Sequence, residues 1–165
     1  MDAQRALSLV RSKAAEWKLD PKRIGMLGFS AGGHLTAAAS TQYNERAYPA
    51  IDDIDKESCR PDFAVIIYPG GLLNAEKTAL RDQIKVTDQT PPTFLAMTTD
   101  DPVNPDNAVE YWRALKNAKV PVELHLYPTG GHGYGLRHDA GVHATWNKRC
   151  EEWMAANGWL KRSPL

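Results

Sequence analysis

A serine flanked by glycines constrains this chain more than any other feature. Residues 28–33 read Gly-Phe-Ser-Ala-Gly-Gly, so a glycine stands two positions before Ser30 and two positions after it. Residues 24–28 have the composition of a short buried strand, and residues 31–42 that of a helix. A G-x-S-x-G pattern at such a junction is typical of a strained turn that exposes a serine hydroxyl at the end of a sheet, with glycines where a Cβ would clash. We therefore expect this turn at Ser30.

Two further strands end beside residues that could complete a site around Ser30. An apolar run at 93–98 leads into Asp100 and Asp101. Another run at 122–127 leads into a glycine-rich loop that contains His132. In open parallel sheets the carboxyl ends of the strands are where sites are built, so these groups are expected to meet.

The blocks from Asp20 to His34 and from Asp100 to Leu136 resemble α/β-hydrolases of the acetyl-xylan-esterase and carbohydrate-esterase type, which are related to the prolyl-oligopeptidase and dienelactone-hydrolase branches. The resemblance covers nearly the whole chain. It implies a serine esterase that cleaves short-chain, acetyl-type esters, such as those on carbohydrate, through an acyl-enzyme and without a metal or organic cofactor. The alternatives are a serine peptidase of the prolyl-oligopeptidase type and a non-catalytic, oligomerising remnant of a hydrolase.

The resemblance also implies a role for each residue of the expected site. Ser30 is the nucleophile and His132 the general base. Asp100 is the acid that orients the imidazole, because the family's acid stands three residues before a valine or similar residue, here Val103. Asp101 is then an ordinary aspartate of a turn or helix start. The backbone N–H of Ala31, at the start of the helix, is one oxyanion-hole donor.

The family pattern places several strands and a His-Gly-Gly type loop before the serine turn, and that loop supplies a second oxyanion donor. This chain starts at the helix before the turn, which suggests either a truncated form of a longer enzyme or a short hydrolase with a donor from elsewhere. The Gly70-Gly71 pair is one such source. With one donor identified we expect low turnover. The cellular compartment stays undetermined, because a targeting segment would precede this region.

The other histidines are expected to be structural. His34 lies one helical turn after Ser30 and favours a packing contact. His125 alternates with leucines in the run at 122–127, as a histidine within a sheet would. A zinc site from His132, His138 and His143 lacks a tight ligand spacing, so no metal site is expected.

Composition favours one catalytic domain over residues 1–165. The 20 Lys and Arg residues balance the 20 Asp and Glu residues, so no basic field favours nucleic acid or an acidic membrane. No apolar run approaches the roughly 18 residues of a membrane span. The two cysteines, Cys59 and Cys150, are expected to be free thiols.

The order of the expected elements indicates an α/β fold with a parallel sheet that lacks its N-terminal strands. Acidic residues in a polar insertion at 43–61 are expected on a solvated face, and the aromatic residues of the helices in the core. The expected helices cover 2–17, 31–42, 106–118 and a C-terminal segment with Trp146 and Trp153, and the expected strands cover 24–28, 62–68, 93–98 and 122–127.

The strand at 24–28 is expected to have one unpaired edge, because its second neighbour in the family's sheet precedes this chain. The edge is apolar, carries no proline, and has Arg23 as its one blocking charge. We therefore expect a homo-oligomer in which this edge, or the bare sheet face beside it, packs against another copy.

Overall fold

Parallel strands form the centre of the structure, a computed structural model that describes residues 1–137 and 141–160. Within the described residues the sheet has four strands in the order β1-β2-β3-β4, so each strand pairs with its neighbours along the chain. The expected α/β fold with a parallel sheet is confirmed. The strands are β1 (Gly25–Phe29), β2 (Phe63–Ile67), β3 (Thr93–Thr98) and β4 (Val122–Tyr127).

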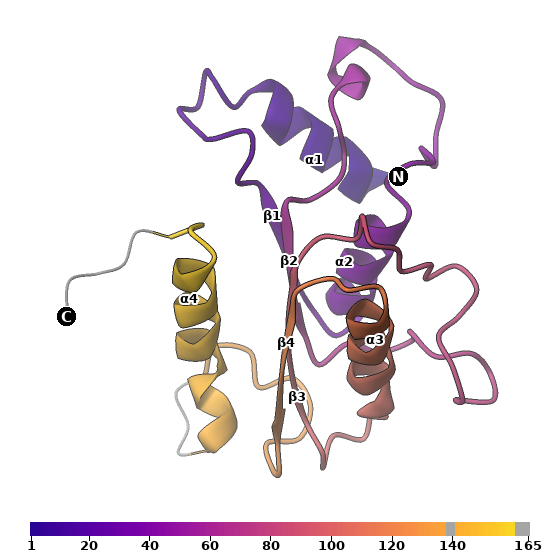
Figure 1. The fold of residues 1–165 in the computed structure, drawn as a ribbon, viewed down its shortest axis with the longest axis vertical. Coiled ribbons are helices and arrows are strands. Elements are labelled where there is room, and N and C mark those ends of the chain that lie inside the picture. The colour runs from indigo at the N-terminus through magenta and orange to yellow at the C-terminus, as the bar shows by residue number, and fades with distance from the viewer. Residues whose placement is uncertain (138–140, 161–165) are drawn as a thin grey trace.

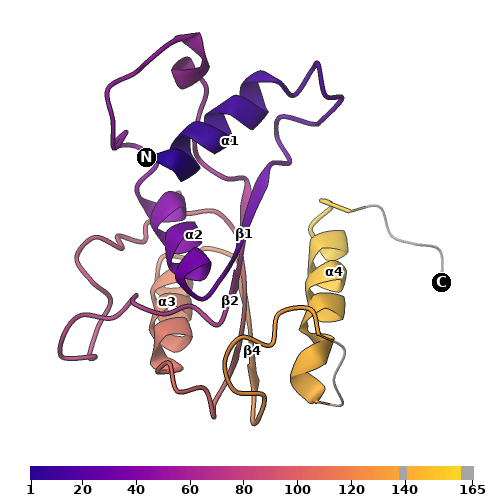
Figure 2. The same ribbon diagram turned by 180° about the vertical axis from the view of Figure 1, so that it is seen from behind.

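Helices cover both faces of the sheet. α2 and α3 lie on one face and α4 lies on the other, while α1 packs on α2 and on the short 3-10 helix η1 (Figures 1 and 2). None of the described helices is long and apolar enough to cross a membrane. The helices are α1 (Asp2–Ser12), α2 (Ala31–Thr41), α3 (Asp106–Asn117) and α4 (Trp146–Ala156), with η1 at Asp53–Lys56 and a second 3-10 helix, η2, at Val142–Thr145.

The core lies between these layers. Every residue of β2 and β3 is buried, as expected for strands with helices on both sides. Tyr111, Trp146 and Trp153 are buried in the core, which confirms that these aromatic residues pack inward. Trp17 was expected on the buried stripe of a helix at 2–17 but is 49% exposed, because α1 ends at Ser12 and the chain then continues through turns.

The insertion at 43–61 contains a buried ion pair, so the expectation of a wholly solvated acidic face is wrong. The Asp55 side chain is completely buried and pairs with Arg5 and with Arg46, at 3.0 Å in each case. It also accepts hydrogen bonds from the Tyr48 hydroxyl at 2.6 Å and the Ile51 N–H at 2.8 Å. Burial by itself raises the pKa of Asp55, but these hydrogen bonds and Arg5 outweigh it and hold the pKa well below its usual range.

Asp55→Asn should therefore lower the midpoint of thermal unfolding by several degrees at pH 7, because it leaves two arginines without their shared anion. Since the folded-state pKa is lowered, the carboxylate stabilises the fold above the unfolded-state pKa of about 3.9, and this stabilisation is lost as the pH falls towards the folded-state value. Calorimetry from pH 7 to pH 3 would measure it. Asp53→Asn, an exposed neighbour, is the matched control. A gap between Asp55→Asn and wild type that stays constant down to pH 3 would contradict the assignment.

One edge of β1 has no neighbour among the described strands. Ser30 N–H donates to Ile67 O at 3.0 Å and Ile24 O accepts from Asp62 N–H at 2.7 Å, both on the β2 side. Backbone groups alternate in direction along a strand, so the N–H and C=O groups of the odd-numbered residues of β1 point to the open edge. Leu27 in this strand is 50% exposed. The expected unpaired edge is therefore present in the structure.

Self-association along this edge stays a prediction. A second copy pairing along β1 would satisfy the free backbone groups and cover Leu27. Leu27→Lys should shift a dimer towards monomer, because a lysine on an edge disfavours strand pairing. Sedimentation velocity over a dilution series measures this, with the exposed Leu35→Lys as the control. A wild-type chain that stays monomeric at concentrations above about 100 μM would overturn the prediction.

Candidate active site

The turn between β1 and α2 places Ser30 at the carboxyl end of the sheet. Ser30 has φ 52° and ψ −116°, a strained conformation for a residue other than glycine. A Cβ on Gly28 would lie 2.0 Å from the Gly32 carbonyl oxygen, so the glycine before the serine is needed to let the helix turn back over the strand. At Gly32 the expectation of a clash is wrong, because nothing lies within 4 Å of an added Cβ.

Ser30, His132 and Asp101 form a continuous chain of contacts. The Ser30 Oγ lies 2.8 Å from the His132 Nε2. On the other side of the ring, Nδ1 lies 2.8 Å and 3.0 Å from the two carboxylate oxygens of Asp101. The Asp101 side chain is fully buried, while that of His132 is 26% exposed. An imidazole held in this way can accept a proton from the hydroxyl on one nitrogen while the carboxylate stabilises the charge that develops.

Asp100 does not contact the imidazole, so its assignment as the orienting acid is wrong. Its two carboxylate oxygens instead accept backbone hydrogen bonds from Gly131 N–H at 2.8 Å and Gly130 N–H at 3.1 Å. The Gly131 hydrogen bond is the largest cause of a lowered pKa for Asp100. The two aspartates are directed apart because Asp101 turns inward, where its Oδ1 also accepts the Val103 N–H at 2.7 Å.

The loop that carries His132 is held at several points besides Asp100. The Thr98 hydroxyl, at the end of β3, donates to Gly131 O at 2.8 Å. The Trp146 indole N–H donates to Gly135 O at 2.7 Å. Gly135 N–H in turn donates to the Tyr68 hydroxyl at 3.2 Å. Sequence reasoning missed Tyr68 and Trp146. For Tyr68 a signal was available, because it directly follows β2, at the same edge of the sheet as the other site residues.

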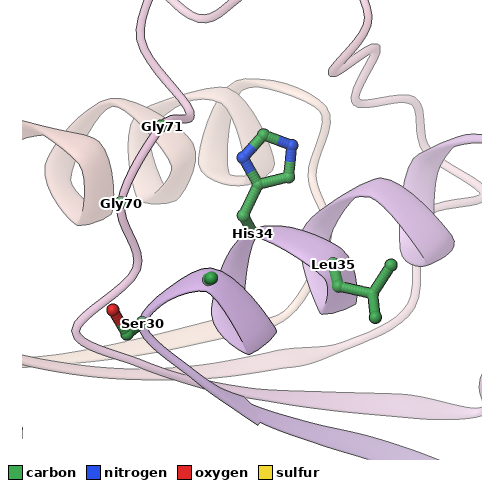
Figure 3. Close-up of a pocket in the computed structure, with 6 residues that line it drawn as sticks. Ser30, His34, Leu35, Gly70 and Gly71 are labelled. Carbon is green, nitrogen blue, oxygen red and sulfur yellow. The ribbon is translucent and has the colours of Figure 1, made fainter.

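A cavity of about 540 Å³ opens beside Ser30. It is lined by Ser30, Ala31, His34, Leu35, Gly70 and Gly71 (Figure 3). Ala31 is the first residue of α2, where backbone N–H groups have no acceptor within the helix, so it can serve as an oxyanion donor, as the sequence predicts. Gly70 and Gly71 line the same cavity. That one of their N–H groups is the second oxyanion donor stays a prediction.

The side chains of His34 and His125 stand apart from this chain of contacts. The His34 ring points towards Gly71, and an added Cβ on Gly71 would lie 3.0 Å from its Nδ1 (Figure 3). His125 contacts the Glu123 carboxylate at 2.7 Å and packs against Phe94, which confirms a structural role. The described residues contain no group of three or more potential metal ligands. His138, one member of the zinc site considered from the sequence, lies outside them.

Both cysteines are buried and unpaired, as expected. Burial raises the pKa of the Cys150 thiol to about 12, so this thiol is not a reactive nucleophile. Neither cysteine lines the cavity, whereas Ser30 does and its hydroxyl contacts the His132 imidazole.

A serine on a strained strand-to-helix turn, followed along the chain by an aspartate and a histidine from later strands of a parallel sheet, defines the α/β-hydrolase class. Comparison with known proteins agrees with this class. The BD-FAE family model matches residues 1–74, which include the serine turn. A crystal structure of an acetyl ester-xyloside bifunctional hydrolase from Caldicellulosiruptor lactoaceticus superposes with a TM-score of 0.86 at 37% identity, over 96% of this chain and 65% of that one.

Curated relatives point in the same direction. An acetylxylan esterase from Xylanibacter ruminicola is 28% identical over 99% of this chain and 35% of its own length. Endo-1,4-beta-xylanase B from Butyrivibrio fibrisolvens is 30% identical over 84% of this chain and 25% of its own length. The chain thus spans about a third or less of these relatives. The resemblance to α/β-hydrolases of the acetyl-xylan-esterase type is confirmed.

The two neighbouring aspartates should respond differently to the same substitution. Asp101→Asn should lower kcat for ester hydrolysis about a thousandfold to ten-thousandfold, because an amide favours the wrong tautomer of His132. Asp100→Asn should cost far less, because it leaves the contacts of the imidazole in place and its amide oxygen still accepts a loop N–H. Steady-state kinetics on p-nitrophenyl acetate would compare them, each with its thermal midpoint. A greater loss in Asp100→Asn would reverse the assignment.

Proposed function

We propose that this protein is a serine esterase that hydrolyses short-chain, acetyl-type carboxylic esters carried by carbohydrate. The observation that carries the proposal is the continuous contact from Asp101 through His132 to the Ser30 hydroxyl. The relatives supply the substrate class, because one is named an acetylxylan esterase and another an acetyl ester-xyloside bifunctional hydrolase. The open cavity beside Ser30 leaves room for an ester whose alcohol part is larger than its acetyl part.

The proposed reaction has two halves with one covalent intermediate. The Ser30 Oγ attacks the ester carbonyl carbon as its proton passes to the His132 Nε2, and the carbonyl oxygen becomes an oxyanion beside the Ala31 N–H. When the tetrahedral intermediate collapses, the bond to the alcohol oxygen breaks, and His132 returns the proton to that oxygen. A water molecule then attacks the acyl-enzyme by the same route and releases the acid and free Ser30.

The positions of the side chains support this division of work. Asp101 is fully buried, so its charge acts on the imidazolium through little intervening solvent. The His132 side chain is partly exposed, as a group that meets both the substrate and the attacking water must be. Ala31 begins a helix, and the positive end of the helix dipole favours the oxyanion.

Ser30→Ala and His132→Ala should each abolish most ester hydrolysis, with losses on the order of a thousandfold or more that do not add in the double variant. A fluorophosphonate should label wild-type Ser30 covalently, and the labelled residue is found by peptide mass spectrometry. His132→Ala should label far more slowly, because its serine lacks a base. Asp53→Asn, an exposed substitution remote from the site, is the control and should keep the activity and labelling of wild type.

Substrate pairs separate this proposal from its rivals. A serine esterase turns over p-nitrophenyl acetate and acetylated sugars faster than a prolyl amide, whereas a peptidase of the prolyl-oligopeptidase type shows the opposite order. A folded chain whose Ser30 takes no label and whose activity equals that of Ser30→Ala is a non-catalytic remnant. That outcome would overturn the proposal.

A further inference from the structure

Tyr68 adopts a backbone conformation that is rare for an aromatic residue. It directly follows β2 and has φ 39°, in the left-handed region that favours glycine. Its N–H donates to Ala96 O at 2.8 Å, so the residue stays attached to the neighbouring strand. Strained residues persist only where their surroundings over-determine them, and they gather at functional sites. The conformation of Tyr68 therefore calls for a reason within the site.

The Tyr68 side chain lies against the proposed base. Its ring and the His132 imidazole are 4.9 Å apart between centroids and inclined at 64°. Tyr134 packs on Tyr68 at 4.6 Å and 77°, and Phe29 packs at 5.7 Å and 38°. Tyr68 is 4% exposed. Aromatic rings prefer such inclined arrangements, so the neighbours fix the ring that contacts His132.

The hydroxyl of Tyr68 provides a second attachment, to the loop itself. It accepts the Gly135 N–H at 3.2 Å, three residues after His132 in the chain. Burial raises the pKa of Tyr68, so the phenol stays neutral at physiological pH. One side chain thus contacts both the imidazole and the backbone of the loop that carries it.

We propose that Tyr68 is a positioning residue that sets the tilt of the His132 imidazole. The contacts of Nε2 with Ser30 and of Nδ1 with Asp101 both lie at the ring's edge. They fix the two nitrogens but leave the ring able to rock about the line that joins its partners. A buried aromatic ring against the imidazole removes that freedom. This inference rests on the proposed function, because it concerns how the base is aligned for proton transfer.

The test compares two substitutions that replace Tyr68 with an apolar side chain. Tyr68→Phe keeps the ring and loses the hydroxyl, so kcat on p-nitrophenyl acetate should stay within about threefold of wild type, since loss of one neutral hydrogen bond at the loop has a modest effect. Tyr68→Leu loses the ring, so kcat should fall about 10- to 100-fold through misalignment of the base, with KM within about twofold. The rate of Ser30 labelling by a fluorophosphonate should fall in parallel with kcat.

A matched control separates alignment from general loss of stability. Tyr111→Leu removes a fully buried aromatic ring in α3, whereas the ring that packs on His132 is that of Tyr68. This variant should lower the thermal midpoint with little effect on kcat in the folded protein. Should Tyr68→Leu fail to fold, Tyr68→Met, whose flexible side chain fills irregular space, replaces it with the same expectations. Equal kcat for the ringless variant and Tyr68→Phe would overturn the inference. A wild-type Ser30 that takes no label would instead overturn the proposed function.

Discussion

The parallel register of the four strands is the constraint on which the site depends. Ser30 follows β1, Tyr68 follows β2, Asp101 follows β3 and His132 follows β4. Because all four strands run in the same direction, these four residues meet at the carboxyl ends of the strands although they are far apart in the chain. The contact of 2.8 Å between Ser30 and His132 joins the two outer strands, so it requires the two buried strands between them to keep their pairing.

The two neighbouring carboxylates, Asp100 and Asp101, hold His132 in different ways. Asp100 accepts two backbone N–H groups just before His132 and so fixes the path of the loop. Asp101 accepts the imidazole N–H and so fixes the ring. Asp100 is exposed and binds backbone, whereas Asp101 is buried and binds the imidazole. Neither carboxylate can take over the contacts of the other unless the loop moves.

Much of the fold follows from the sequence by periodicity alone. The limits of β3 and β4 agree with the apolar runs at 93–98 and 122–127, and the glycine at position 28 is needed where the pattern places it. The identity of the acid does not follow. Counting from Val103 selects Asp100, but the local turn in which the Asp101 Oδ1 accepts the Val103 N–H rotates the second aspartate inward, and spacing alone cannot show this.

The buried ion pair at Asp55 and the position of Tyr68 were not predicted from the sequence, and the reason is the same for both. An acidic cluster in a polar segment is usually solvated, and a tyrosine after an apolar strand is usually core. What distinguishes these two residues is the partner that the fold brings from far along the chain, Arg5 in one case and His132 in the other. Local patterns report which elements form. The groups that hold the site together are fixed by contacts between elements, and those contacts depend on how the sheet aligns its strand ends.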